Sequence, residues 1–128
     1  MGYCDKCVTK YGDYLYVLFR AIIGLLFFMH GWSKFAGGMA QGLMLAAAIV
    51  EVVAGVGIFL GVFTRALSTL GAIQMAVAFF MVHAKQGLNP LANGGELAVL
   101  YFAAFLVLAV YGNKKWSVEK ALLKKEVF

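Results

Sequence analysis

Four long apolar runs, separated by short polar segments, cover most of the chain. They occupy residues 14–32, 43–62, 66–83 and 97–112. A helix needs about 17–25 mainly apolar residues to cross the hydrocarbon core of a bilayer. Backbone in lipid must satisfy its own hydrogen bonds, which leaves helices or a closed barrel, and the alternating segments of a membrane barrel are absent. The pattern therefore predicts four transmembrane helices, the fourth slightly short.

The connections between the runs are short and rich in turn residues. Thr64 and Arg65 form a tight turn, and the longest connection, residues 84–95, carries Pro90 and ends in Asn93-Gly94-Gly95. Short connections make consecutive helices antiparallel neighbours. We expect an all-α fold, an antiparallel four-helix bundle whose fourth helix begins near Glu96.

Residues 1–13 form a polar N-terminal segment ahead of this membrane domain of residues 14–112, and residues 113–128 form a basic tail. In the tail, Trp116, Leu122 and Leu123 are mixed with lysines. This mixture is typical of a short amphipathic helix that lies on anionic lipid headgroups. The polar first segment also gives no sign of a cleavable signal peptide.

Composition agrees with a membrane protein of one domain. Hydrophobic residues make up 63% of the chain and charged residues 13%, against about 45–50% and about 25% in soluble domains. The net charge of +5 comes largely from five lysines in the last fifteen positions. Such a basic tail is expected beside a membrane span, so we expect no nucleic-acid binding.

The basic residues also predict an orientation. Four spans place both termini on one side, which then holds Lys6, Lys10, Arg65 and the five tail lysines, against Lys34 and Lys85 on the other side. Loops on the cytoplasmic side carry an excess of lysine and arginine. The protein is therefore expected to be a multi-pass protein of the cell membrane with both termini in the cytoplasm.

Five ionisable residues lie within or at the ends of the apolar runs: Arg20, His30, Glu51, His83 and Glu96. Such residues are costly in a bilayer and usually mark a cavity or a partner. With Tyr14 and Val62 taken as the inner ends of the first two runs, a rise of 1.5 Å per residue places Glu51 about 7 Å from the levels of both Arg20 and His30. An arginine side chain can cover that distance, so an Arg20–Glu51 pair is geometrically reasonable. Simpler roles stay open: snorkelling of Arg20, interfacial placement of both histidines, and a helix N-terminal charge at Glu96.

These positions, with several glycines, resemble the DoxX family. The resemblance rests on Arg20, Gly24, His30-Gly31, Lys34, Glu51, Gly55, Gly61-Val62-Phe63-Thr64-Arg65, His83 and Glu96, and spans residues 14–117. It implies a small four-helix membrane protein. Some related members are subunits of thiosulfate:quinone oxidoreductase or quinol-oxidase systems, and others are linked to thiol and oxidative-stress defence.

The resemblance also implies a quinone site in a redox system. Its catalytic residues would be His30, Glu51 and Arg20, because histidine can exchange a proton near neutral pH and the carboxylate can relay one. Substrate-binding positions would be Lys34, His83, Glu96 and Trp32, of which the cations would attract an anion such as thiosulfate. Haem-attachment, flavin and nicotinamide fingerprints are missing from the sequence, so a second redox subunit is expected.

Cys4 and Cys7 form a C-x-x-C motif that lies outside the family resemblance. Three interpretations stay open: a redox dithiol, half of a metal site, or two incidental cysteines. A zinc site needs about four ligands, and both histidines are expected across the bilayer. We therefore predict no metal site within one chain.

Two other functions stay open beside the redox hypothesis. The buried charges could fix helix packing in a non-catalytic membrane scaffold whose tail binds a partner, or Glu51 could couple protons in a small transporter. Gly57 and Gly61 allow close backbone approach, either within the bundle or in a homodimer.

Overall fold

The computed structural model describes residues 3–38 and 41–124. This part of the chain contains helices and no strand, with the helices α1 (Tyr3–Ala36), α2 (Leu43–Leu60), α3 (Thr64–Ala78), α4 (Pro90–Asn93), α5 (Glu96–Tyr111) and α6 (Val118–Leu123). A π-helix, Phe79–His83, and a 3-10 helix, Ala84–Gln86, continue α3. The all-α prediction is confirmed, and α5 begins at the predicted Glu96.

Three helical segments in this part of the chain are long and apolar enough to cross a membrane: Cys4–Ala36, Leu43–Leu60 and Thr64–Gln86. The fourth long helix, α5, has 16 residues and so spans about 24 Å. Large apolar side chains are exposed along the outside of the helices, as Leu18, Ile22, Leu25 and Met29 are on α1. In water this surface would be unfavourable, so the molecule is a helical membrane bundle.

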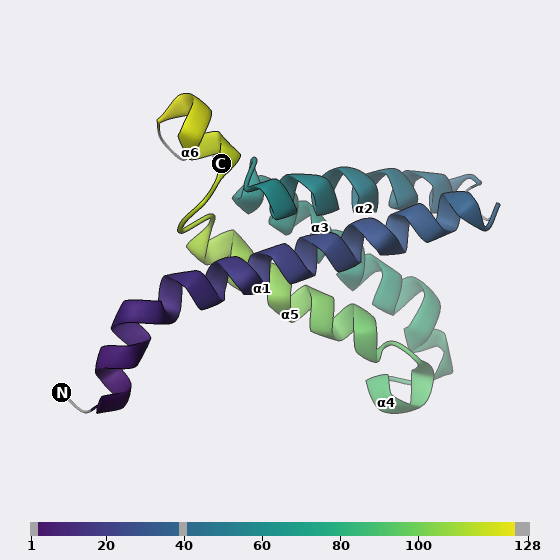
Figure 1. The fold of residues 1–128 in the computed structure, drawn as a ribbon. Coiled ribbons are helices and arrows are strands. Elements are labelled where there is room, and N and C mark those ends of the chain that lie inside the picture. Colours follow the sequence, from purple (N-terminus) through teal and green to yellow (C-terminus); the bar gives the residue numbers. More distant parts are fainter. Residues whose placement is uncertain (1–2, 39–40, 125–128) are drawn as a thin grey trace.

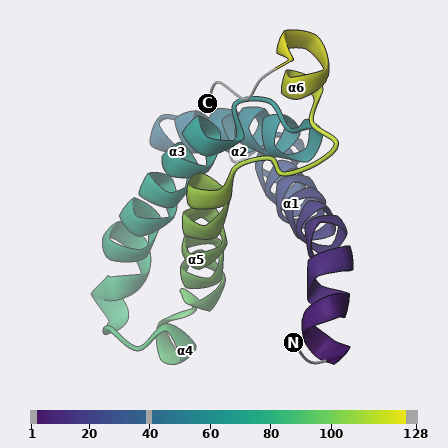
Figure 2. The same ribbon diagram turned by 90° about the vertical axis from the view of Figure 1, so that its left-hand side faces the viewer.

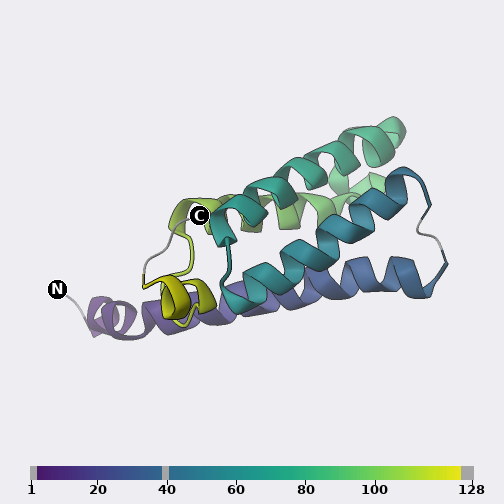
Figure 3. The ribbon, with the colours of Figure 1, turned by 90° about the horizontal axis from the view of Figure 1, so that it is seen from above.

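The long helices pack as two antiparallel pairs, α1 with α2 and α3 with α5, joined through a smaller contact between α2 and α3. Figure 3 shows α2 between α1 and α3. Figure 2 shows α3 and α5 side by side, with the N-terminal part of α1 extending away from them. We name the end where α2 and α5 finish the terminal end, and the end where α1 finishes and α5 begins the loop end (Figure 1).

Two glycines of α1 fix how α1 is aligned with α2. A Cβ atom on Gly24 would lie 2.6 Å from the backbone nitrogen of Phe59, and one on Gly31 would lie 2.7 Å from Cβ of Glu51. Such contact of two helices at small residues is typical of membrane bundles. It places Glu51 at the level of Gly31, near the loop end.

This alignment shows that the predicted Arg20–Glu51 pair is wrong. Arg20 lies eleven residues before Gly31, so about 16 Å of helix separates it from the level of Glu51. The estimate from sequence places Tyr14 level with Val62, on the assumption that both apolar runs end at one membrane surface. Instead α1 begins at Tyr3, and the glycine contacts set the alignment.

Arg20 holds the C-terminal segment against the bundle. Its guanidinium group is buried and donates hydrogen bonds to the carbonyl oxygens of Asn113 (2.7 Å), Lys115 (2.9 Å) and Trp116 (2.8 Å). Lys114 and Trp116 have positive φ angles of 65° and 50°, a conformation that costs energy in residues other than glycine. The arginine therefore secures a bent segment just after α5.

Buried polar residues continue this packing into α6. Thr64 donates a hydrogen bond to the side-chain oxygen of Asn113, whose amide group donates to Glu119 (3.3 Å). The backbone nitrogen of Glu119 donates to the carbonyl of Gly61 (3.2 Å). The predicted C-terminal helix is present as α6, with Leu122 and Leu123 exposed, and residues 125–128 of the predicted tail lie outside the described residues.

Candidate functional site

A cavity of about 610 Å³ lies at the loop end, between the two helix pairs. The backbones of α1 and α5 are in little direct contact, and aromatic side chains fill the space between them farther in. The ring of Phe27 lies 4.7 Å from that of Phe105 and 5.4 Å from that of Tyr101, centroid to centroid. The cavity begins beyond these rings, where Phe27 and Tyr101 form part of its wall.

Glu51 is the buried charge of this cavity, with 1% of the residue exposed. Its Oε1 atom accepts hydrogen bonds from Lys34 Nζ (2.5 Å) and from Gln74 Nε2 (2.8 Å). Its Oε2 atom is buried and has no hydrogen-bond partner among the described residues. A buried carboxylate oxygen without a partner is energetically costly, so this atom offers a binding position to a donor group in the cavity.

His30 lies beside the Oε2 atom of Glu51, between this atom and the molecular surface. Its Nδ1 atom lies 4.0 Å from Glu51 Oε2, and 48% of its side chain is exposed. The imidazole ring also meets the ring of Tyr101 edge-on at 6.1 Å. His30 is thus in a position to exchange protons between the surroundings and the carboxylate.

The opposite wall comes from the π-helix that follows α3. Met81, Val82 and His83 of this helix line the cavity. His83 Nδ1 lies 3.2 Å from the carbonyl oxygen of Asn93, and the Asn93 side chain bonds the backbone of Gly87 and Gly95. These bonds hold the connection between α3 and α5, so His83 has a fixed place. Single π-helical turns often occur at functional sites.

The rim of the cavity between α2 and the π-helix is apolar. Leu43 and Met44 lie on one side and Met81 and Val82 on the other, and all four side chains are exposed. This rim belongs to the same apolar outer surface that a bilayer would cover. A lipid-soluble molecule could therefore enter from the membrane between these two helices.

Four residues predicted as site positions line this cavity together: His30, Lys34, Glu51 and His83. The other predicted positions lie elsewhere. Arg20 binds the C-terminal segment at the terminal end, and Glu96 is exposed at the start of α5.

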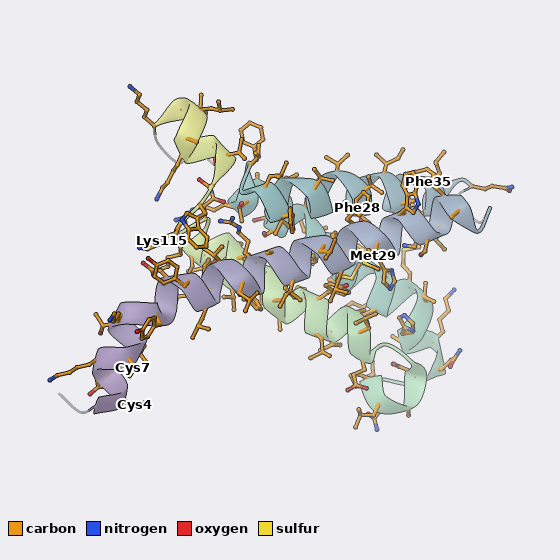
Figure 4. The ribbon with its side chains drawn as sticks, in the orientation of Figure 1. Cys4, Cys7, Phe28, Met29, Phe35 and Lys115 are labelled. Carbon is orange, nitrogen blue, oxygen red and sulfur yellow. The ribbon has the colours of Figure 1, made fainter. Side chains whose placement is uncertain are left out.

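Trp32 is 58% exposed and stacks on Phe28 at 6.1 Å, on a face of α1 outside the cavity lining. Cys4 and Cys7 lie in the first turns of α1, far from the cavity (Figure 4).

Two polar residues of the site were missed from the sequence, Gln74 and Tyr101. Gln74 is an amide in the middle of the third apolar run, where a polar group needs a partner. A polar residue at this position therefore indicates a buried partner, and this pattern is visible in the sequence. Tyr101 could not be separated from the other aromatic residues of the fourth run, because only the packing of α5 against α1 places it beside His30.

The cavity suits a mainly apolar ligand with a few polar atoms. Small-molecule pockets typically have about 300–1,000 Å³ and apolar walls with a few polar groups, as here. Lys34, Gln74 and His30 supply hydrogen-bond donors, and Glu51 supplies an acceptor. The described residues include no group of three His, Cys, Asp or Glu side chains able to hold a metal ion.

Comparison with known proteins agrees with the resemblance seen in the sequence. The model of the DoxX family matches residues 15–84. An "Uncharacterized protein" of Haemophilus influenzae is 31% identical over 92% of this chain and 98% of its own length. A Bacillus subtilis protein named "Putative oxidoreductase CatD" is 28% identical over 84% of this chain and 87% of its own length. No solved structure gives a significant match.

Proposed function

The chain belongs to the DoxX family, and we propose that it is the membrane subunit of a quinone-linked oxidoreductase system whose cavity binds the quinone head group. The observation that carries this proposal is the buried Glu51. Its Oε2 atom has no hydrogen-bond partner among the described residues, so it can accept a hydrogen bond from a hydroxyl group of the reduced quinone, and the donors Lys34, Gln74 and His30 lie in the same apolar cavity. The oxidoreductase name of the Bacillus subtilis relative supports a redox role only in general terms.

Quinone chemistry suits the groups that line this cavity. A bound quinone would supply two-electron redox chemistry coupled to two protons. Its ring would pack on Phe27, Met75 and Tyr101, and its carbonyl oxygens would accept hydrogen bonds from Lys34 or from His30. The apolar rim would let a lipid-soluble tail remain in the bilayer.

Protons would move through His30 and Glu51. Glu51 Oε2 has no hydrogen-bond partner among the described residues, so it can take up a proton that a quinol hydroxyl releases, and the half-exposed His30 can pass that proton to water. Lys34 stabilises the charged carboxylate at 2.5 Å. The residues of this chain would thus position the ring and carry protons, while a second subunit would carry the electron donor.

We also propose the orientation that the basic residues favour. The terminal end carries most of the basic residues that the structure describes, and it would face the cytoplasm of the cell membrane. These residues are Lys6, Lys10, Arg65, Lys114, Lys115, Lys120 and Lys124. The cavity, with Lys34 and His83, would then lie toward the outer face. Protons released at His30 would leave on that side.

Binding of a short-chain benzoquinol, the reduced form whose hydroxyl groups can donate to Glu51 Oε2, to the purified protein in nanodiscs tests the proposal. After subtraction of binding to empty nanodiscs, we expect one saturable site per chain. Glu51→Gln and His30→Ala should each weaken it about tenfold, which corresponds to about 1.4 kcal/mol, within the range of a single hydrogen bond. Glu96→Gln is the matched control, because it makes the same change at an exposed carboxylate outside the cavity lining.

Other outcomes would point to the alternative functions. Binding equal to that of empty nanodiscs would contradict the quinone site. If partner binding were then lost on removal of the tail, a scaffold role would be favoured. Substrate uptake into proteoliposomes without an electron donor, abolished by Glu51→Gln, would favour a small proton-coupled transporter.

A further inference from the structure

Two free cysteines lie one turn apart at the start of α1, far from the cavity. Cys4 is exposed and Cys7 is partly exposed, and both lie on the part of α1 that extends beyond the other helices (Figure 4). We propose that Cys4 and Cys7 form a reversible dithiol–disulfide site that exchanges with low-molecular-weight disulfides. This activity is independent of the quinone proposal.

The spacing of the two residues allows a disulfide at this place in the helix. Residues three apart lie on the same face of a helix, with Cβ atoms about 5–6 Å apart. A disulfide needs about 3.5–4.5 Å between these atoms, so the turn must tighten slightly. The i→i+3 geometry of a 3-10 turn achieves this, and such turns are common at helix ends.

The position at the start of α1 keeps the cost of tightening low. The first four backbone N–H groups of a helix have no partner within the helix, so little hydrogen bonding is lost when this turn changes. Neither Cys4 nor Cys7 is buried, so no core packing changes either. The same pair in the middle of α1 would disturb its contact with α2.

The chemistry of the surroundings favours a dithiol over a metal site. Zinc in structural sites has four protein ligands, and the described residues include no cluster of three potential ligands. A dithiol needs two sulfur atoms only. If the terminal end faces the cytoplasm, its reducing conditions would keep the pair reduced between reactions.

Distance separates this site from the cavity. His30 lies twenty-three positions after Cys7 on α1, which corresponds to about 35 Å along the helix. Direct exchange of electrons with a ligand in the cavity is therefore not part of the proposal.

The reaction is balanced by the disulfide partner. One cysteine attacks the disulfide as its thiolate, forms a mixed disulfide and releases the first thiol. The second cysteine then attacks the mixed disulfide, closes the Cys4–Cys7 bond and releases the second thiol. The dithiol loses two electrons, the small disulfide gains them, and the two protons of the cysteines leave with the two thiols.

Intact mass spectrometry after incubation of the full chain with oxidised glutathione tests this site. We expect the wild type to lose two hydrogens and to carry no glutathione. Cys4→Ser and Cys7→Ser should each trap one glutathione per chain, because no second thiol can release it. The double variant Lys6→Cys/Cys7→Ser is the spacing control: its cysteines are two residues apart on different faces, so it should carry two glutathiones.

Three results would overturn the proposal: two glutathiones on the wild type, a disulfide-linked dimer as its main product, or thiols that stay unmodified. Zinc binding at one ion per two chains that protects the thiols would instead assign the motif to half of a metal site. The serine variants should retain wild-type quinone binding in nanodiscs, so failure of one proposal does not affect the other.

Discussion

Replacement of Arg20 by methionine should release the C-terminal segment from the bundle. The substitution keeps an apolar chain in the buried space and removes the three hydrogen bonds to the carbonyls of Asn113, Lys115 and Trp116. Each bond to a charged group contributes about 1.5–3 kcal/mol, but partly exposed carbonyls can bind water instead. We therefore expect a loss of about 3–5 kcal/mol in the free energy of unfolding.

Two measurements follow this change. Reversible unfolding in mixed micelles gives the free energy, and limited trypsin digestion reports how readily the chain is cut after Lys114 and Lys115. Arg20→Lys should lower the free energy of unfolding by roughly half as much, because an ammonium group keeps the charge but lacks the planar guanidinium group that can donate to several carbonyls at once. Arg65→Met is the control, since Arg65 is exposed and donates to the carbonyl of Val110 at the same end, and we expect it to cost at most about 1 kcal/mol.

Unchanged stability and unchanged cleavage in Arg20→Met would refute this reasoning. The hydrogen bonds from Arg20 would then not be what holds the C-terminal segment against the bundle.

Three further predictions concern helix packing, the buried ion pair and the orientation. Gly31→Ala should lower the free energy of unfolding by about 1–3 kcal/mol, because the added methyl group overpacks the contact with α2. Gly12→Ala should raise it by about 0.5–1 kcal/mol, because the nearest atom to the added Cβ, on Val8, lies 4.0 Å away. Thermal unfolding of both variants checks this. Lys34→Met should lower the free energy of unfolding by about 3–5 kcal/mol, because it leaves the buried Glu51 without its cation. In a double-mutant cycle, Glu51→Gln in the same chain should restore most of this loss. Additive effects of the two substitutions would argue against the ion pair. A membrane-impermeant maleimide should label the native cysteines from the cytoplasmic side and a Lys85→Cys variant, with both native cysteines replaced by serine, from the outside; the reverse pattern would contradict the proposed orientation.

Much of the architecture could be predicted because it depends on runs of apolar residues. The runs at residues 43–62 and 97–112 correspond to α2 and α5 within two residues at each end. Such runs are informative because a segment that crosses a bilayer must be mainly apolar over about 17–25 residues. The structure of the polar N-terminal segment is harder to predict, because α1 extends back to Tyr3, well outside the apolar run.

The site could be predicted only in part, because depth along a helix is easier to estimate than alignment between helices. Placing His30, Lys34 and His83 at one end required only the order of the spans. Pairing Arg20 with Glu51 required the alignment of α1 with α2, which close contacts at Gly24 and Gly31 decide. No periodic pattern in the sequence reports those contacts.

Other features depend on contacts between distant parts of the chain. The π-helix Phe79–His83 lies within an apolar run that predicts an ordinary helix. The role of Asn113 was also hidden, since a polar residue just after a span is usually exposed, and here it is fully buried against Thr64 and Glu119. Such networks form only when the whole bundle is assembled.

Photolabelling with an azido-substituted benzoquinone tests the central claim most directly, because it locates the bound ring. The account predicts covalent label on peptides that contain His30, Met75 or Tyr101. Excess unlabelled quinone should reduce this label, and so should His30→Ala, which removes a donor to the quinone carbonyl. Label confined to lipid-facing residues such as Leu25 and Phe59, and unaffected by competitor, would mean that quinone only dissolves in the surrounding bilayer and would contradict a quinone site in this cavity.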